Sequence, residues 1–309
     1  MPGIGIVLNP HSRSNKRNPG RAHRLGFIVG DKGSCHITDE ISQIRQLAET
    51  FKQREVEILG ISGGDGTYHH TLTTFIDVYG TTPLPKICFL RGGTMNLIAN
   101  NLGIKGTPES ILSRLIYQYH QDIPFQTVPL SVLKINEDYG CVFSVGMLHN
   151  FVKIFYQTKN PTRWDAVCLL IKGTLLALLN TKWAGELCRR FDATVTVDGK
   201  PWPFKNYVDV FGGTVKSIGL GFRPFYRLKN NPGHFQLLGF SAQPRSIVWR
   251  FPRLLMGKPT GSEDFIDGLA QTVTIEFAKP QGYFVDGEMY EPTQRIAITM
   301  GPKIEAIIP

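Results

Sequence analysis

The sequence predicts a two-domain protein, in which a parallel α/β domain is followed by a mostly antiparallel β domain. The chain has 309 residues, which is too long for one ordinary hydrophobic core. Up to about residue 125, apolar runs alternate with loops and helical patterns, as in a parallel sheet. Beyond that point, short alternating or β-branched runs are separated by turn residues, which is typical of antiparallel strands.

The first domain begins with a predicted strand that ends at Asn9-Pro10, because proline cannot donate a hydrogen bond to a ladder. Apolar side chains then recur at helical spacing after Asp39, a typical cap residue. In chain order we expect a strand at 3–8, a loop at 11–24, a helix at 39–54, a strand at 56–62, a helix at 68–79, a strand at 86–90 and a short helix at 97–103.

The second domain is expected to consist of short strands, with one long helical stretch at about residues 163–190. The string "VDGKP", which starts at Val197, has the Asp-Gly signature of a tight hairpin. The expected strands are the runs "TVPLSVLKI", "YGCVFSVGM", "ATVTVDGKPW", "YVDVFGG", "HFQLLGF", "TVTIEFA", "GYFVDGEMY" and "RIAITM".

Composition favours a cytoplasmic protein with anionic partners. The five cysteines lie far apart without C-x-x-C spacing, which argues against a disulfide framework or a zinc site. No apolar run reaches the roughly 18 residues of a membrane span, and the N-terminus lacks the pattern of a signal peptide. The net charge of +9 suits nucleotides, an acidic membrane surface or nucleic acid, and by itself selects none of them.

The string "GGDGT" at residues 63–67 follows a predicted strand and precedes a predicted helix. The first turn of a helix exposes unpaired N–H groups, and glycines let the backbone approach an anion closely, so this turn is a candidate phosphate site. Asp65 would repel phosphate, so we expect it to face a metal ion or to accept a proton. The competing interpretation is an ordinary tight turn in which Asp65 or Thr67 caps a helix.

Three further stretches agree with this motif in type and order. They are Asn9-Pro10 with its Ser-rich and basic loop, "RGGTMNLIANNLGI" at 91–104, and "VDGE" at 285–288. Together with GGDGT, the sequence resembles the diacylglycerol kinase catalytic-domain family, which includes bacterial lipid kinases, sphingosine and ceramide kinases and, more distantly, NAD kinases.

The resemblance implies a Rossmann-like N-terminal domain and a C-terminal β-sandwich. The nucleotide-binding domain would span residues 1–125, and the lipid-substrate domain would span residues 126–292. Residues 293–309 would be strands that return to the first domain.

The resemblance also implies that ATP is the phosphoryl donor, with Mg²⁺ as its metal ion. Phosphates would be held by backbone N–H groups without a Walker lysine, and the chain contains no Walker string. Arg13, Lys16 and Arg17 could add positive charge or could form a solvated basic loop. Thr94 and Asn96 would line the nucleotide pocket, unless they serve only as a turn and a helix cap. The expected nucleotide-binding residues are Asn9, Pro10, Ser12, Arg13, Gly63, Gly64, Asp65, Gly66, Thr67, Gly93, Thr94 and Asn96.

The late "VDGE" motif supplies the expected catalytic carboxylates. By resemblance, Glu288 is the base that accepts the proton of the lipid hydroxyl, and Asp286 and Asp65 lie near the magnesium ion and the proton path. The metal ligands would be Asp65 and Asp286. The competing interpretation of this motif is a plain hairpin turn, which is how we interpret "VDGK" at 197–200.

Departures from the family pattern leave the acceptor open, and one of them, the stretch "LKNNPGHFQLL" at 228–238, lacks the carboxylates with which many bacterial members bind a structural magnesium ion. His69 and His70 stand where the family usually has an asparagine and often an acidic residue, and Leu97 stands where aspartate is common. We expect neutral imidazoles, because the helix N-terminus disfavours positive charge. Alternatives to diacylglycerol are a sphingoid base, another glycerolipid, NAD, or a nucleotide- or lipid-binding role without catalysis.

Residues 241–262 combine basic and aromatic side chains without an acidic residue, a mixture that can lie at a lipid interface. The competing interpretation is a helix packed on the second domain with a basic outer face. The expected partners are therefore ATP and a lipid substrate at a membrane surface, with peripheral membrane association. Nucleic acid is not expected, because the chain has no recognition motif for it, and a homodimer remains open.

Overall fold

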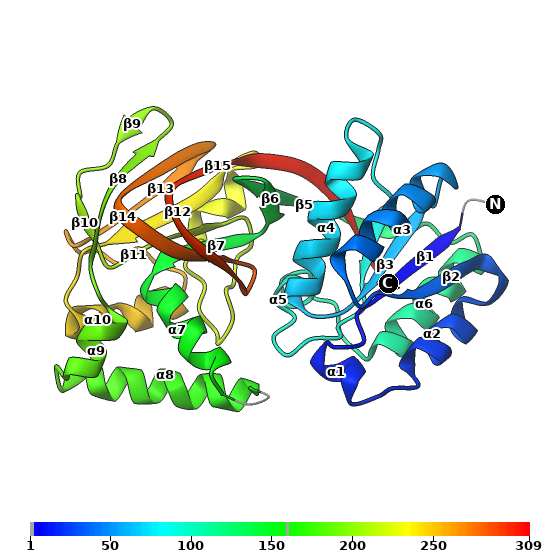
Figure 1. Ribbon diagram of the computed structural model, residues 1–309, viewed down its shortest axis with the longest axis horizontal. Helices are drawn as coiled ribbons and strands as arrows, with labels where there is room; N and C mark the ends of the chain where they lie inside the picture. The colour runs from blue at the N-terminus through cyan, green and yellow to red at the C-terminus, as the bar shows by residue number, and fades with distance from the viewer. Residues whose placement is uncertain (1–2, 159–160) are drawn as a thin grey trace. The chain divides into compact units, whose positions relative to one another are not determined.

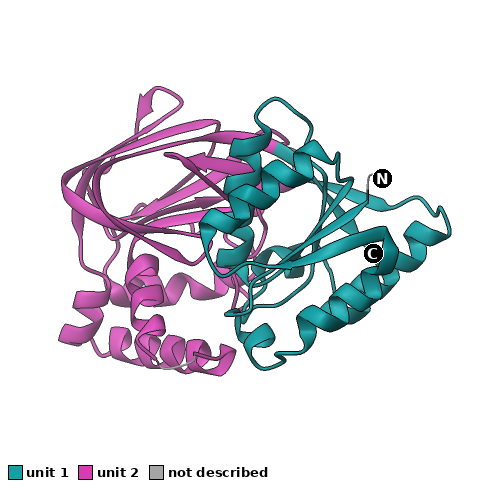
Figure 2. Cartoon of the chain, turned by 45° about the vertical axis from the view of Figure 1, so that its right-hand side comes forward, with its two compact units in different colours: residues 1–130, 303–309 teal, residues 131–302 magenta. Residues whose placement is uncertain are grey.

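The computed structural model describes residues 3–158 and 161–309 (Figure 1). The fold is mixed α/β, with a large sheet and strands at the C-terminal end, so the mixed class predicted from the sequence is confirmed. The chain divides into two compact units (Figure 2). The first unit is Met1–Leu130 with Lys303–Pro309, and the second is Ser131–Pro302.

The first unit is built on four parallel strands in the order β2-β1-β3-β4. Strands β1 and β3 are buried along their whole length, as expected for the centre of a parallel sheet. The final residues of the chain also join this unit, where Ala306 pairs with Ile87 of β4. The elements are β1 (Ile4–Leu8), α1 (Arg13–Lys16), α2 (Arg21–Val29), η1 (Gly30–Lys32), β2 (Gly33–Ile37), α3 (Ile41–Gln53), β3 (Ile58–Ser62), α4 (Asp65–Tyr79), β4 (Lys86–Phe89), α5 (Leu97–Asn101) and α6 (Pro108–His120).

Two predictions for this unit were wrong in detail. The basic stretch 11–24 is not a loop throughout, because α1 and the first turn of α2 lie within it. The polar composition of this stretch predicts side chains exposed to solvent, but the side chain of Arg21 is buried. Helix α3 is capped by Glu40 rather than by Asp39, and Gln43 completes the capping box.

The second unit is an antiparallel arrangement of strands, as the sequence predicts. Its core is formed by residues such as Phe143, Tyr207, Phe235 and Ile275. The elements are β5 (Gln126–Ile135, which begins in the first unit), β6 (Asp138–Gly140), β7 (Val142–Gly146), α7 (Met147–Tyr156), α8 (Arg163–Leu178), α9 (Lys182–Leu187), β8 (Phe191–Val197), β9 (Lys200–Pro201), β10 (Asn206–Tyr207), β11 (Asp209–Gly213), η2 (Tyr226–Asn230), β12 (Phe235–Phe240), α10 (Pro244–Leu255), β13 (Phe265–Ala270), β14 (Thr272–Val285) and β15 (Glu288–Ile308).

The long helical stretch expected at 163–190 is two helices rather than one. Asn180 has a left-handed backbone, with φ of 51°, and ends α8. Thr181 then caps α9 by accepting a hydrogen bond from the N–H of Ala184 at 3.4 Å. Helices α7 to α10 gather on one side of the strands of this unit (Figure 1). In the part of the chain that the structure describes, no helix is long and apolar enough to cross a membrane.

Candidate functional site

Three motif loops of the first unit lie at one edge of its sheet. They follow strands β1, β3 and β4, which are parallel neighbours, so their carboxyl ends meet at the same edge. The loops are 9–12, 63–64 and 90–96. In open α/β sheets, ligands bind outside the carboxyl ends of the strands, so this edge is the candidate site.

The glycines of two of these loops are required where the loops touch. The N–H of Gly92 donates to the carbonyl of Gly63 at 2.7 Å. A Cβ atom on Gly92 would lie 2.8 Å from the nitrogen of Gly63, and one on Gly93 would lie 2.3 Å from the Cα of Gly64. Any larger residue would force the loops apart, so their close packing is a reason for glycine that does not depend on phosphate.

Asp65 links the same two loops through its side chain. Its Oδ1 accepts a hydrogen bond from the N–H of Leu97 at 2.6 Å, so it caps α5 although it belongs to the first turn of α4. Burial of the carboxyl group raises the pKa of Asp65 to about 6, and backbone N–H groups, including those of Leu97 and Ile98, partly oppose this shift. Asp65 is therefore a helix cap, as the competing interpretation predicts, but it caps the neighbouring helix α5 rather than its own helix α4.

Asn9 fastens the first loop to helix α4. Its Nδ2 donates to Oγ1 of Thr67 at 2.9 Å, and its Oδ1 accepts from the N–H of His11 at 2.8 Å. The carbonyl of Asn9 accepts from Ser12 Oγ at 3.1 Å and from Asn15 Nδ2 at 2.8 Å. The Asn-Pro pair thus forms a turn whose position is fixed by side-chain hydrogen bonds.

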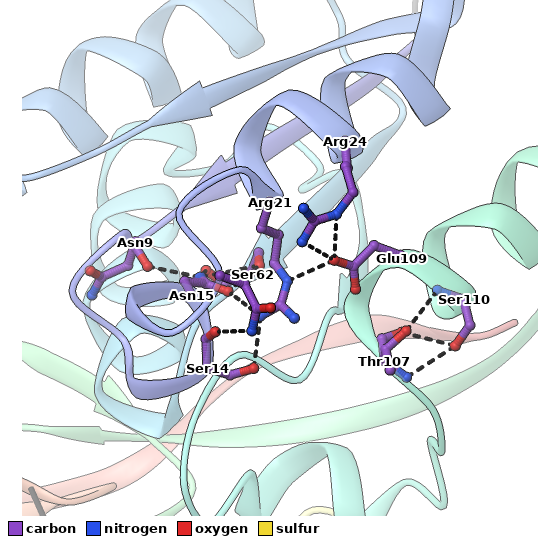
Figure 3. A network of polar contacts seen from close by, with 10 residues as sticks. Asn9, Ser14, Asn15, Arg21, Arg24, Ser62, Thr107, Glu109 and Ser110 are labelled. Carbon is purple, nitrogen blue, oxygen red and sulfur yellow. Dashed lines mark hydrogen bonds and ion pairs between the residues drawn. The ribbon is translucent and has the colours of Figure 1, made fainter.

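A buried arginine supports this loop, and sequence reasoning missed it. Arg21 donates from Nη1 to Oδ1 of Asn15 at 2.9 Å and to Oγ of Ser14 at 2.7 Å (Figure 3). Its Nε pairs with Oε1 of Glu109 at 3.0 Å. Asn15 continues the network to the carbonyl of Ser62, at the end of β3, at 3.0 Å. The network therefore ties the first loop to β3 and to α6.

Glu109 is the anionic end of this network. Partial burial opposes its ionisation, but the backbone N–H at its own helix start and the hydrogen bonds from Arg21 and Arg24 outweigh this effect and lower the pKa of Glu109. It is consequently ionised at neutral pH and balances the buried guanidinium of Arg21. No local sequence signal marks the pair, because the two residues are 88 positions apart.

The side chain of Asn96 is engaged within its own loop. Its Oδ1 accepts from the N–H of Gly93 at 2.9 Å, and its Nδ2 donates to the carbonyl of Gly93 at 3.0 Å. Its backbone is left-handed, with φ of 49°, a conformation that asparagine tolerates. These contacts agree with the competing interpretation, in which Asn96 serves the turn and the helix cap, better than with a side chain that points at a nucleotide.

All the predicted nucleotide-binding residues lie on the three loops or on the first turn of the following helix. Lys16 and Arg17 are exposed, at the end of α1 and just beyond it. His69 is fully buried in α4, with its ring 5.0 Å from that of His70. The residues so placed are Asn9, Pro10, Ser12, Arg13, Gly63, Gly64, Asp65, Gly66, Thr67, Gly93, Thr94 and Asn96.

The predicted catalytic carboxylates belong to the second unit, on the β14–β15 hairpin. Asp286 has a left-handed backbone, with φ of 48°, and Val285 pairs with Glu288 across the turn. Both carboxylate oxygens of the buried Asp286 accept backbone hydrogen bonds, from Cys141 at 2.8 Å and Val142 at 2.9 Å. The turn predicted as the plain interpretation is thus present, and it is anchored to β7.

A preformed metal cluster is not evident in the described chain. Within residues 3–158 and 161–309, no group of three or more His, Cys, Asp or Glu side chains could hold a metal ion.

A glycine-rich edge of a parallel sheet is typical of nucleotide-binding domains. Residues 4–128 match the family described as "Diacylglycerol kinase catalytic domain". The match confirms the predicted resemblance for residues 4–128, which contain three of the four motifs, and a catalytic domain of this kind implies a kinase-type phosphotransferase. No curated protein matches the chain.

Solved structures of Bacillus anthracis str. Sterne share this fold along the whole chain. A "putative diacylglycerol kinase" is 15% identical, with a TM-score of 0.74, and the match covers 99% of this chain and 97% of the other. A second structure, described as a diacylglycerol kinase, is 14% identical over the same shares, with a TM-score of 0.68. At such low identity, the likeness concerns the fold alone.

Proposed function

We propose that this protein is an ATP-dependent lipid kinase that transfers the γ-phosphoryl group to the hydroxyl of diacylglycerol or a related lipid. The observation that carries the proposal is the meeting of three motif loops at one edge of the parallel sheet in a diacylglycerol kinase catalytic domain. In this proposal, the first unit is the Rossmann-like nucleotide-binding domain and the second is the sandwich that receives the lipid.

The loops suit the phosphates of ATP. Helix α4 has 15 residues, and its first turn directs N–H groups and a partial positive charge toward the GGDGT loop. Glycine at 64 and 66, which are only partly buried, places no side chain between the backbone and phosphate oxygens. Arg13 adds positive charge near the first loop. Phosphoryl transfer depends mainly on such positioning and charge neutralisation.

Three carboxylates can serve as Mg²⁺ ligands or as the proton acceptor, namely Asp65, Asp286 and Glu288. Asp65 and Asp286 accept backbone hydrogen bonds, so either would bind a metal ion through its remaining lone pairs. Mg²⁺, when bound, neutralises charge on the phosphates. Glu288 is the proposed base toward the lipid hydroxyl, and Asp286 shapes the turn that presents it. A base in this role contributes about 10² to 10⁴ in rate.

The test is incubation with γ-labelled ATP and extracted membrane lipids, followed by lipid separation. We expect the wild-type protein to label one lipid, and Glu288→Gln to lose that product. Glu291→Gln is the matched control, because Glu291 is an exposed glutamate on the same strand, and its variant should retain the product.

Failure would have a definite meaning. If ATP bound but no diacylglycerol, sphingoid base, other glycerolipid or NAD became labelled, the kinase proposal would be rejected. The remaining candidate would be a nucleotide- or lipid-binding relative, which is favoured by Leu97 in place of aspartate and by the capping role of Asp65.

A further inference from the structure

Helix α8 exposes a stripe of large apolar side chains. Trp164 is 77% exposed, Ile171 54% and Leu175 56%, and Leu179 at the C-cap is 74% exposed. With the exposed Cys168, these residues are three or four positions apart, which places them within an arc of about 80° at 3.6 residues per turn. The stripe therefore runs along one face for the length of the helix.

The opposite face of α8 packs on the protein through small residues. Ala166 and Ala177 are buried, and a Cβ atom on Gly173 would lie 3.6 Å from the ring of Trp183. A surface helix of a soluble protein normally turns its large apolar residues inward. Helix α8 does the reverse, and an exposed apolar stripe of this extent is typical of an interaction surface.

The charge around the stripe indicates the partner. Helix α10 packs against α8, and it also exposes Trp249, at 67%, beside the exposed Arg245 and Arg253. Residues 163–190 and 241–262 together contain nine Lys and Arg against two acidic residues, or +7 of the net charge of +9. A second copy of the chain would bring two such charges together, whereas anionic lipid headgroups would neutralise them.

We propose that α8 lies in the interfacial layer of an anionic lipid bilayer, with its stripe among the acyl chains and the basic residues of α8 to α10 on the headgroups. Apolar burial and headgroup attraction are the two contributions that hold interfacial helices at membranes. Lys172 of α8, whose ammonium group lies over the ring of Trp183 of α9, is one such cation.

The structure changes the surface expected from the sequence. Within 241–262, Arg250 donates to the carbonyl of Thr260 at 3.2 Å, and the ring of Phe251 packs against Phe222 with centroids 5.3 Å apart. These two side chains therefore support the fold of α10. Trp249 stays exposed, and α8 with its C-cap exposes more large apolar side chains than α10 does.

This inference rests on the proposed function only in that a lipid kinase must reach its acceptor, and it is tested by binding alone. The variant Trp183→Phe, Trp202→Phe, Trp249→Phe, whose only tryptophan is Trp164, is mixed with vesicles of phosphatidylcholine and phosphatidylglycerol. We expect a blue shift of its fluorescence, and quenching by lipids that are brominated on their acyl chains. Absence of quenching by brominated lipids would overturn the proposal.

A second measurement uses otherwise unaltered protein in vesicle co-sedimentation. The triple variant Ile171→Gln, Leu175→Gln, Leu179→Gln should bind at least tenfold more weakly, since three large apolar side chains no longer enter the bilayer. Phe27→Gln, at an 82% exposed position on α2 of the first unit, is the control and should bind like wild type.

Unchanged binding of the triple variant would refute the assignment of the surface. A dimer in sedimentation velocity that the triple variant loses would also refute it, in favour of a second copy. Lipid phosphorylation in detergent micelles is measured in parallel. Retained phosphorylation with failed vesicle binding rejects this surface alone, and failed phosphorylation with retained binding rejects the kinase proposal alone.

Discussion

Two hairpins of the second unit, at 197–200 and 285–288, share the string Val-Asp-Gly and the same turn. Asp198 and Asp286 have φ values of 47° and 48°, and the glycines that follow have 77° and 95°. Positive φ at both central residues defines the two-residue turn that Asp-Gly favours. Each aspartate also accepts two successive backbone N–H groups from a neighbouring strand.

The hairpins differ in burial and in the residue after the glycine. Asp286 is 4% exposed, whereas the hydrogen bonds of Asp198 are exposed to solvent. Lys200 follows the first turn and Glu288 the second. The shared aspartate is thus explained by the turn and its anchor, and the glutamate is the feature that the turn does not require. This contrast is why we propose Glu288, rather than Asp286, as the base.

The largest effect on stability is expected for Asp286→Ala. The change leaves the N–H groups of Cys141 and Val142 buried without an acceptor, and each such group costs about 1–3 kcal/mol. We therefore expect a loss of about 2–4 kcal/mol in the free energy of unfolding, measured by urea denaturation. A loss below about 1 kcal/mol would contradict the anchoring role.

A smaller loss is expected for Asp198→Ala. The N–H groups of Gln271 and Thr272 lie at the surface, so water can replace the carboxylate. We expect a loss of up to about 1 kcal/mol, the usual net value of a solvated hydrogen bond. The same denaturation experiment checks this value, and equal losses for the two aspartates would break the comparison.

The pH dependence should differ in sign between Asp198 and Asp65. Partial burial opposes the ionisation of Asp198, but hydrogen bonds from Thr272 and Gln271 outweigh it and lower its pKa below the ordinary value of 3.8. Its stabilising contribution is therefore present above 3.8 and lost as the pH falls further. Burial raises the pKa of Asp65 from 3.8 to about 6, so its contribution is present below 3.8 and lost as the pH rises through 6.

Melting temperatures between pH 3 and pH 7.5 can separate these two contributions. Relative to wild type, Asp65→Asn should gain stability as the pH rises, because it carries no buried charge. Asp198→Asn should lose stability over the same range, because wild type gains its favourable carboxylate. If the stabilities of the two variants changed with pH in the same direction relative to wild type, burial would not raise the pKa of Asp65.

The smallest effect is expected for Lys200→Glu, which creates a second Val-Asp-Gly-Glu string in the chain. Lys200 is exposed on the two-residue strand β9, so stability should change by less than about 0.5 kcal/mol. The substitution should not restore phosphoryl transfer to Glu288→Gln protein. Restored transfer would mean that the motif acts through its string rather than through its place in the fold.

Local patterns predicted those parts of the molecule that local chemistry determines. Asp-Gly predicted the hairpin at 197–200 and supplied the competing interpretation for 285–288. The strand–loop–helix rhythm predicted the parallel sheet, and the structure shows that residues 9–12, 63–64 and 90–96 follow neighbouring strands of it. The motif residues were found because their spacing resembles a family. The contacts of these motif residues were not predicted. The glycines let two loops approach so closely that a Cβ atom would not fit between them, and Asp65 caps a helix that starts 32 residues later in the chain.

The remaining features, the buried Arg21 and the orientation of α8, depend on tertiary contacts and could not be predicted from local patterns. Arg21 lies in a stretch that reads as a solvated loop, because its counter-ion Glu109 is distant in sequence. The apolar run of α8 predicted a helix but not its orientation, which depends on small residues that pack inward. In both cases the sequence shows the residue types, but it does not show the distant residues that they contact.

The central claim is that Glu288 serves catalysis and not nucleotide binding or folding. It is tested most directly by measuring, in one preparation of Glu288→Gln protein, the Kd for ATP and the kcat for phosphorylation of diacylglycerol in micelles. We predict a Kd within about twofold of wild type and a kcat lower by about 10² to 10⁴. An unchanged kcat, or a loss explained entirely by weaker ATP binding, would contradict the claim.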